Sequence, residues 1–275
     1  MESDKVTVQY IQAKKKAGKK IAMLTAYDYF LAKMVDEAGV DAILVGDSLG
    51  MVVLGYTSTT HVTMDDMIRH AEAVRRGTKR ALLIGDMPYK SFDNPSNAVK
   101  NASRFVEEAG CEAVKLEGES YGAASAIIKR GIPVLGHLGL TPQTASEFKV
   151  QGRDASKAAE ILGAAKRLEQ AGCFGVVLEC IPAELADIIT SSLSVPTIGC
   201  GAGQLCDGQI LVINDILGLF DRFLPKFAKR YADLGAIAKE AISKYKKEVE
   251  AGEFPKKENS FTMRKEELEK MEKIR

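Results

Sequence analysis

Acidic and basic side chains end several apolar runs of this sequence, at positions where a buried strand would ordinarily carry none. Asp47 ends AILVGD, Asp86 lies in ALLIGDMP, and Glu179 lies in GVVLEC. A fourth run, AVKLEG, carries both Lys115 and Glu117. Carboxylates are the ligands that a hard cation such as Mg²⁺ prefers. These residue types therefore suit metal-assisted chemistry on an acidic substrate, with the lysine neutralising that substrate.

The chemistry that fits this set is enolate formation from a 2-oxo acid. A metal that chelates a 2-oxo acid polarises its carbonyl and stabilises the enolate formed when a neighbouring proton leaves. The reaction also needs a separate carboxylate as base, because a carboxylate bound to a metal is a poor proton acceptor. A zinc site is not indicated, since the chain has 3 histidines and shows no His or Cys at zinc-ligand spacing.

Eight short apolar runs could position these residues. They are nearly continuously apolar, as strands covered on both faces are, and helix-like or polar segments follow them. The runs are 20–27, 42–47, 81–88, 113–118, 132–137, 175–180, 195–201 and 209–215. Eight strands alternating with helices predict an α/β fold, a (β/α)₈ or TIM barrel. A doubly wound open sheet is the alternative, although no Gly-x-Gly-x-x-Gly follows the first run.

Helix signals separate the runs. Segments 28–39, 63–77, 94–110 and 154–172 have polar caps at their starts and glycine at their ends. Two more helices are expected in 231–275, on either side of an extended EFPKKENSF. We expect one barrel domain with C-terminal helices over 1–262. A charged extension over 263–275 would be solvated or would form an oligomer contact.

Chemistry in such a barrel lies at the C-terminal ends of the strands. Alternation along a strand places Ile43, Val45 and Asp47 on one face, and Lys115 and Glu117 on another single face. Leu82, Ile84 and Asp86 alternate in the same way. Glu179 shares a face with Val177, which points Cys180 to the other side. If each of these faces is the inner one, the polar groups converge on one pocket.

Plainer explanations exist for each residue. Asp47 could cap a turn or a helix, Asp86 could end a strand in a turn, and Glu179 could begin a helix. Lys115 and Glu117 could form an ion pair with each other. Such coincidences at five residues in analogous positions are less expected together than singly.

The histidines divide into two kinds. His137 ends the run IPVLGH, where it could border the pocket or serve as a hydrogen-bonded structural residue. His61 and His70 lie in or beside an expected surface helix, and we interpret both as structural.

Bulk properties narrow the classes of function. The 275 residues include 38 Lys and Arg against 37 Asp and Glu, a net charge of +1 that favours neither a nucleic-acid nor a membrane-surface partner. No signal peptide is visible, and no apolar run reaches the roughly 18 residues that span a bilayer. Five cysteines without a Cys-x-x-Cys pair are expected to be reduced thiols, so we expect a cytoplasmic protein.

The sequence resembles the ketopantoate hydroxymethyltransferase family over about residues 5–262. The matching stretches include LTAYDYFLAKMVDEAGVDAILVGDSLGMVVLGYTST (24–59), LLIGDMPY (82–89), VKLEG (114–118), GHLGLTPQ (136–143), LECIPAELA (178–186) and IGCGAGQLCDGQILVINDILGL (198–219). The resemblance implies a barrel of the phosphoenolpyruvate/pyruvate superfamily. It also implies that 5,10-methylenetetrahydrofolate donates a hydroxymethyl group to 3-methyl-2-oxobutanoate. The product would be 2-dehydropantoate, or ketopantoate, used in pantothenate and coenzyme A synthesis.

The same resemblance implies a cofactor, an assembly and roles for particular residues. Asp47 and Asp86 would bind Mg²⁺, with Glu117 completing the metal site. The family typically assembles as a homodecamer, a pentamer of dimers.

The resemblance further implies which residues meet the substrate. Ser48 and Lys115 would hold the oxo acid together with the two aspartates, His137 would border the pocket, and Glu179 would be the catalytic base. Two departures from the family pattern stand out. The stretch between GLTPQ and KVQGR is shorter than usual, so we expect a loop of different shape over the pocket mouth, and Asn259 stands where the family usually has histidine.

Three other functions remain open. One is a different Mg-dependent 2-oxo acid enzyme of the same superfamily, such as a C–C lyase, which would not need folate. Another is a catalytically inactive barrel that serves in binding or assembly, although the acids are all present. A third is a sugar-phosphate enzyme, suggested by GCGAG at 199–203, where a glycine turn is the plainer explanation.

Overall fold

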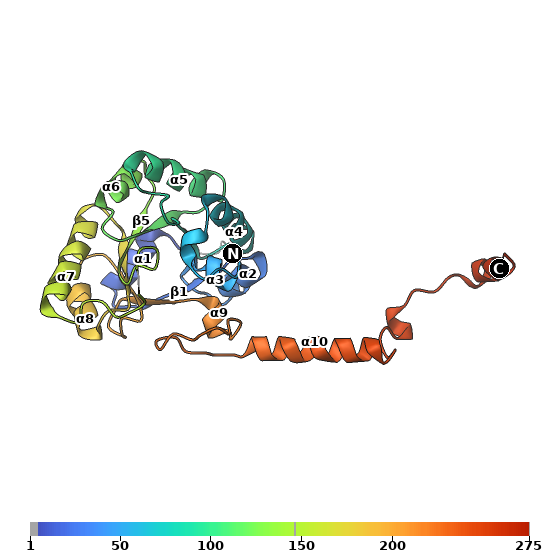
Figure 1. The fold of residues 1–275 in the computed structure, drawn as a ribbon. Helices are drawn as coiled ribbons and strands as arrows, with labels where there is room; N and C mark the ends of the chain where they lie inside the picture. The colour runs from blue at the N-terminus through green and yellow to red at the C-terminus, as the bar shows by residue number, and fades with distance from the viewer. Residues whose placement is uncertain (1–4, 146, 275) are drawn as a thin grey trace.

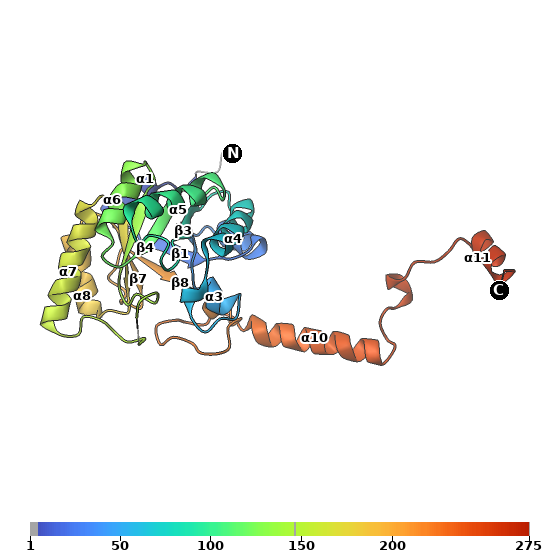
Figure 2. The ribbon, with the colours of Figure 1, turned by 45° about the horizontal axis from the view of Figure 1, so that its top comes forward.

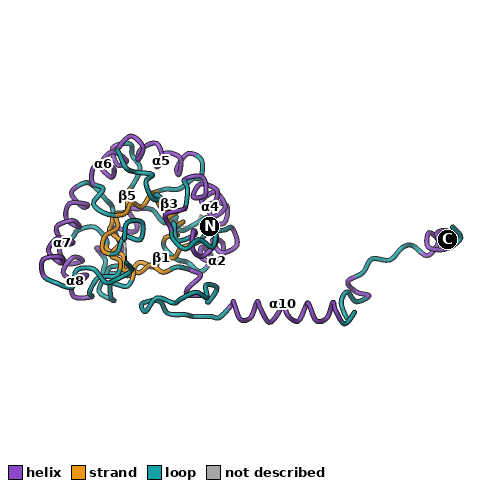
Figure 3. Tube along the Cα trace, in the orientation of Figure 1, coloured by secondary structure: helices purple, strands orange, loops and turns teal. Residues whose placement is uncertain are grey.

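Eight parallel strands form a closed barrel in the computed structural model, which describes residues 5–145 and 147–274. Each strand pairs with its neighbours in sequence, and β8 pairs with β1 (Figures 1 and 3). The strands are β1 (Ile21–Thr25), β2 (Ala42–Val45), β3 (Leu82–Asp86), β4 (Ala113–Glu117), β5 (Val134–Gly139), β6 (Gly175–Glu179), β7 (Thr197–Cys200) and β8 (Gly208–Leu211). The predicted (β/α)₈ barrel is confirmed, and each strand lies within its predicted run or overlaps it.

Helices surround the barrel, as Figure 3 shows. The helices are α1 (Val8–Lys16), α2 (Tyr29–Glu37), α3 (Leu49–Val52), α4 (Met64–Gly77), α5 (Pro95–Glu107), α6 (Tyr121–Lys129), α7 (Ala155–Gln170), α8 (Ala183–Ser192), α9 (Ile213–Ile216), α10 (Leu234–Glu250) and α11 (Lys265–Glu272). Two 3₁₀ turns lie at Thr59–His61 and Lys257–Asn259. The four helices predicted between strands correspond to α2, α4, α5 and α7.

Local sequence explains where these helices begin and end. At α4, the Thr63 hydroxyl accepts from the backbone N–H of Asp66, and the Asp66 carboxylate accepts from the N–H of Thr63. This capping box satisfies two N–H groups that the helix leaves without partners. The glycines that end three predicted helices, Gly39, Gly110 and Gly172, all have positive φ, as a residue that terminates a helix often does.

Two apolar cores lie on the two sides of the barrel wall. The inner core includes Leu44, Leu82, Ile84 and Val177. The outer core lies between the strands and the surrounding helices, and contains Val114 and other alternating residues. The alternation predicted for β3, β4 and β6 is therefore present in the structure.

The alternation predicted for β2 is wrong. Ile43 and Val45 belong to the outer core, so Asp47 does not share an inner face with them. The strand ends at Val45, and Asp47 reaches the interior from the turn that follows. The prediction for Cys180 is wrong as well, because this residue lines the same cavity as Glu179. Its φ of 47° shows that the extended backbone has already ended there.

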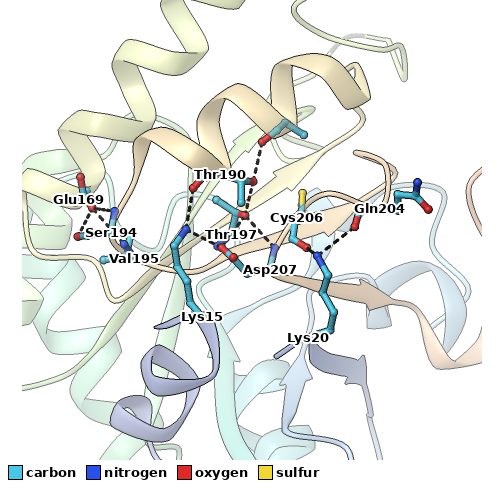
Figure 4. Close-up of polar contacts among 11 residues, drawn as sticks. Lys15, Lys20, Glu169, Thr190, Ser194, Val195, Thr197, Gln204, Cys206 and Asp207 are labelled. Atoms are coloured by element: carbon cyan, nitrogen blue, oxygen red, sulfur yellow. Dashed lines mark hydrogen bonds and ion pairs between the residues drawn. The ribbon is translucent and has the colours of Figure 1, made fainter. Parts of the chain in front are cut away.

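Helix α1 closes the N-terminal end of the barrel. Its Ile11 belongs to the inner core. The Lys15 ammonium donates to the Thr190 carbonyl and to Asp207 Oδ2, both at 2.8 Å (Figure 4). Asp207 Oδ2 also accepts from the backbone N–H of Thr197 at 2.8 Å. These contacts fix α1 to the chain that enters β7 and β8, so access to the interior is left at the opposite end.

The C-terminal helices leave the barrel. Helix α10 and the chain beyond it extend away from the ring of helices, and α11 lies far from the strands (Figures 1 and 2). Neither helix has a buried residue. The domain boundary near 262 remains a prediction, and residue 275 of the proposed extension lies outside the described residues. No described helix combines the length and apolar character needed to cross a bilayer.

Candidate active site

A cavity of about 960 Å³ opens at the C-terminal ends of the strands. Every site residue predicted from the sequence lines it: Asp47, Ser48, Asp86, Lys115, Glu117, His137 and Glu179. We call the six ionisable ones (all except Ser48) the inner cluster. Their convergence explains why strands with buried faces carry charge, since these residues lie around the cavity at the C-terminal end of the barrel.

Asp86 and Lys115 form the closest ion pair of the inner cluster. Asp86 at the end of β3 is the register partner of Lys115 on β4, and the Lys115 ammonium lies 2.8 and 2.9 Å from the two Asp86 oxygens. Glu117 is farther from the ammonium, at 3.8 Å. Burial opposes the charged form of Lys115, but Asp86 and Glu117 outweigh it and raise the Lys115 pKa above its ordinary value. The main partner of Lys115 is therefore Asp86 and not Glu117.

Asp47 lies beside this pair. Its backbone N–H donates to Asp86 Oδ2 at 3.3 Å, and its own Oδ2 accepts from the Gln143 amide at 2.9 Å. Burial, and then the nearby Asp86 charge, raises the pKa of Asp47 to about 8. Burial also raises the pKa of Asp86, although Lys115 opposes that shift. Negative charge on this wall of the cavity is therefore only partly compensated by the protein.

The Ser48 hydroxyl is held by a buried tyrosine. Ser48 Oγ lies 2.8 Å from the hydroxyl of Tyr27, a residue that is 1% exposed. His70 Nδ1 in turn lies 2.6 Å from the Tyr27 carbonyl oxygen, which supports the structural role expected for His70. His61 packs edge-on against the Tyr56 ring, with centroids 5.6 Å apart.

His137 lies between two carboxylates. Its Nδ1 is 3.4 Å from Glu117 Oε1, and its Nε2 is 3.2 Å from Glu179 Oε2. Neither contact has hydrogen-bond geometry, so both act as charge–charge interactions. Burial and Lys115 oppose a charge on His137, but the two carboxylates outweigh them and raise its pKa to about 9. Burial likewise opposes the Glu117 carboxylate, yet His137 and Lys115 prevail and lower the Glu117 pKa.

The donor set is compatible with Mg²⁺. Across residues 5–145 and 147–274, no three His, Cys, Asp or Glu side chains form a ready metal cage, so Asp47, Asp86 and Glu117 do not make a three-ligand site by themselves. Mg²⁺ usually takes one or two carboxylates and completes its shell with water and substrate oxygens. The inner cluster sets four carboxylates against one lysine and one histidine, which leaves negative charge for a cation. Asp47 and Asp86 could therefore hold the ion.

Gln143 is a site residue that no physical argument from the sequence singles out. Its side-chain amide donates to Asp47 Oδ2 and to the Met87 carbonyl, both at 2.9 Å, and its backbone N–H donates to Glu117 Oε2 at 3.1 Å. Gln143 lies in the loop after β5 and is 96 residues from Asp47 in the chain. No periodicity or spacing marks such a residue, and its place at the end of GHLGLTPQ is the available hint.

The glycines of GCGAG serve close packing in a turn. A β-carbon on Gly201 would come within 2.6 Å of the Phe227 ring, and one on Gly203 would come within 2.5 Å of Ala183. Both glycines also have positive φ. These contacts support the glycine turn, the plainer explanation for this motif.

Two solved structures share the barrel. A phosphonopyruvate hydrolase, in complex with oxalate and Mg²⁺, superposes with a TM-score of 0.61 at 15% identity and covers 97% of this chain and 96% of its own. A 2,3-dimethylmalate lyase of the PEP mutase/isocitrate lyase superfamily gives a TM-score of 0.58 at 14% identity, over 97% and 98% of the two chains. At these identities the likeness concerns the fold alone.

Sequence comparison is more specific. A 3-methyl-2-oxobutanoate hydroxymethyltransferase from Syntrophomonas wolfei subsp. wolfei is 54% identical over 273 residues, which is 97% of this chain and 99% of the relative. The enzyme of the same name from Desulfotalea psychrophila is 55% identical over 262 residues, 93% and 94% of the two chains. The model of the ketopantoate hydroxymethyltransferase family matches residues 5–257. The chain therefore belongs to the ketopantoate hydroxymethyltransferase family of enzymes.

Proposed function

We propose that this enzyme transfers a hydroxymethyl group from 5,10-methylenetetrahydrofolate to 3-methyl-2-oxobutanoate, giving ketopantoate for pantothenate and coenzyme A synthesis. The family to which the chain belongs is named for this hydroxymethyl transfer. The observation that carries the proposal is the convergence of the inner cluster on one cavity, with a carboxylate base apart from the acids that suit a metal.

One wall of the cavity would bind the oxo acid. Asp47 and Asp86, with Glu117 nearby, would hold Mg²⁺, which when bound supplies polarisation of the substrate carbonyl. The Lys115 ammonium, kept charged by Asp86, would neutralise the substrate carboxylate. The Ser48 hydroxyl, fixed by Tyr27, would donate to the same substrate.

Glu179 is the proposed general base. It ends β6, which lies across the closed barrel from β2 and β3. Its side chain is 18% exposed, whereas the Lys115 and Asp86 side chains are nearly completely buried. Its carboxylate would take the proton from C3 of the oxo acid, and His137 at 3.2 Å would hold it in position. A base that lies apart from the carboxylates proposed to bind the metal keeps its lone pairs for the proton.

The size and the rim of the cavity support a second, larger substrate. Ligand pockets commonly have about 300–1,000 Å³, and this one lies near the top of that range while 3-methyl-2-oxobutanoate is small. Aromatic and basic side chains line its outer part: Phe148, Lys149, Arg153, Phe223, Lys226 and Phe227. Such a rim suits the flat ring and acidic tail of a folate.

The decisive experiment measures release of tetrahydrofolate from 5,10-methylenetetrahydrofolate with the oxo acid present. We expect release that needs both substrates and Mg²⁺ and that stops in excess chelator. The alternative, a Mg-dependent 2-oxo acid C–C lyase, predicts cleavage of an oxo acid without folate. Folate-independent cleavage together with no tetrahydrofolate release would contradict the proposed function.

We also propose that the protein self-associates, with the homodecamer of the resemblance as the expected assembly, and works in the cytoplasm. Helix α10 supports self-association because it presents large apolar residues to solvent: Ile237, Ile242 and Tyr245 are 61%, 67% and 57% exposed. Apolar area of this kind usually marks an interface.

A further inference from the structure

The loop that follows β5 is fixed at both ends to the end of β6. It leaves the strand through Gly139, whose φ is 97° and where a β-carbon would collide with the Glu179 carbonyl. The Leu140 N–H donates to that same carbonyl at 2.9 Å, and the Gln151 N–H donates to the Cys180 carbonyl at 2.8 Å. The loop is thus tied to the side of the cavity that carries the proposed base.

Between these two ends, Gln143 reaches the opposite side. It is 4% exposed. Its Nε2 donates both hydrogens, one to Asp47 Oδ2 and one to the Met87 carbonyl, each at 2.9 Å. Two acceptors at one nitrogen fix the orientation of the amide. Its backbone N–H donates to Glu117 Oε2 at 3.1 Å, so one residue contacts two acids, one in the turn after β2 and one at the end of β4.

The chemical nature of this contact matters. A neutral amide holds the Asp47 carboxylate in one orientation without cancelling its charge, whereas a lysine or arginine would compete with a cation for that charge. The amide engages Oδ2 and leaves Oδ1 for a cation or a substrate. Asp86, in contrast, has both oxygens on the Lys115 ammonium. Asp47 is therefore the acid whose carboxyl group is oriented and, among the described residues, not taken up by a lysine or arginine.

We propose that Gln143 is a positioning residue: it orients the Asp47 carboxylate for Mg²⁺ and, through its backbone, places Glu117 beside the same site. The inference rests on the proposed function only in taking Asp47 as a ligand of the ion. Gln143 itself contacts the acids and not the reacting atoms.

The test is calorimetric titration of Mg²⁺ into the enzyme with 3-methyl-2-oxobutanoate present. Gln143→Met keeps an unbranched side chain of similar length and removes the donor to Asp47. We expect its Mg²⁺ dissociation constant to rise about tenfold, the effect of losing one hydrogen bond to a charged acceptor. The matched control is Gln151→Met in the same loop, whose amide donates to the exposed Lys149 carbonyl. The control should stay within about twofold of the unaltered enzyme.

Thermal unfolding of each variant separates positioning from a merely structural role. If Gln143→Met lowers the melting temperature but leaves Mg²⁺ affinity unchanged, the inference is wrong. Should that variant not fold, Gln143→Asn keeps the amide but is one methylene too short, and it carries the same expectation and the same overturning result.

The outcome also separates this inference from the proposed reaction. An unaltered enzyme that binds Mg²⁺ and the oxo acid but releases no tetrahydrofolate defeats the reaction and leaves the Gln143 result to be judged on affinity. Equal Mg²⁺ affinity with and without the Gln143 amide defeats the inference alone. An unaltered enzyme that binds no Mg²⁺ defeats both.

Discussion

Lys115 and Asp86 show how strongly a buried charge depends on its partner. Both side chains are almost fully buried, at 6% and 2% exposed, and their atoms are 2.8 Å apart. In such surroundings an ion pair adds little net stability, yet removing one partner leaves the other charge without compensation. The pair is therefore better explained as a way to keep a lysine charged where a substrate carboxylate would bind.

Replacing Lys115 by methionine tests this explanation. Lys115→Met should lower the free energy of unfolding by about 3–5 kcal/mol, since it leaves the Asp86 carboxylate buried and unpaired. It should also raise the KM for the oxo acid at least tenfold. Denaturant unfolding and steady-state kinetics measure the two effects. Lys157→Met, which removes an exposed surface pair with Glu160, should have little effect on stability and leave KM unchanged. A stability loss with unchanged KM would make the pair structural.

Glu179→Gln tests the base while conserving size. The variant should bind Mg²⁺ and oxo acid but lose about 10²–10⁴ in turnover, the usual contribution of a positioned acid–base group. Exchange of the substrate C3 proton with deuterated water, followed by NMR without folate, should be lost to the same degree. Normal exchange in this variant would assign the proton to another group, with His137 at 3.2 Å the first to examine.

At the scale of elements, apolar alternation along strands and apolar spacing along helices predicted the structure correctly wherever the pattern lay within one strand or one helix. The eight strands and helices α2, α4, α5 and α7 follow from local apolar spacing and caps. The residues of β2 that face inward could not be predicted in this way. Alternation ends with the strand at Val45, and Asp47 enters the cavity from the turn that follows. The contact of Gln143 with Asp47 is non-local, and a single sequence carries no information on which loop residue crosses the mouth.

The attachment of α1 gives a prediction for the closed end of the barrel. Asp207→Ala removes the acceptor of both Lys15 and the Thr197 N–H, which are partly buried. We expect a loss of about 2–4 kcal/mol in the free energy of unfolding, because buried donors without partners are costly. The kcat should change less than twofold, since this network lies at the end opposite the cavity. Glu160→Ala, which removes an exposed ion pair on α7, is the control and should have little effect. A large fall in kcat with unchanged stability would contradict the view that one end of the barrel is structural and the other is catalytic.

For the whole molecule, α10, like α11, is an element that a single chain leaves without a core to pack on. Leu234, Ile237, Ile242, Tyr245 and Val249 recur at helical spacing and are all substantially exposed. A second copy of the chain is the partner expected from the family resemblance.

A charge placed in this stripe should therefore disrupt assembly. Ile242→Glu should shift the mass measured by size-exclusion chromatography with light scattering to a smaller species, because a carboxylate would be buried at the contact. Ser243→Glu adds the same charge on the opposite side of the helix and should leave the mass unchanged. Equal masses for the Ile242 variant and the unaltered protein would place the contact elsewhere.

Because α1 closes one end of the barrel, both substrates must enter and both products must leave through the other end, one after the other. The oxo acid would lie deepest, against Lys115, and the folate would occupy the space above it. The small substrate must then add first, and ketopantoate must leave last, after tetrahydrofolate. Initial-rate kinetics should show an ordered sequential mechanism in which ketopantoate is a competitive product inhibitor against the oxo acid. Tetrahydrofolate should not be competitive against that substrate, and a random order of addition would mean that both molecules pass each other in the mouth.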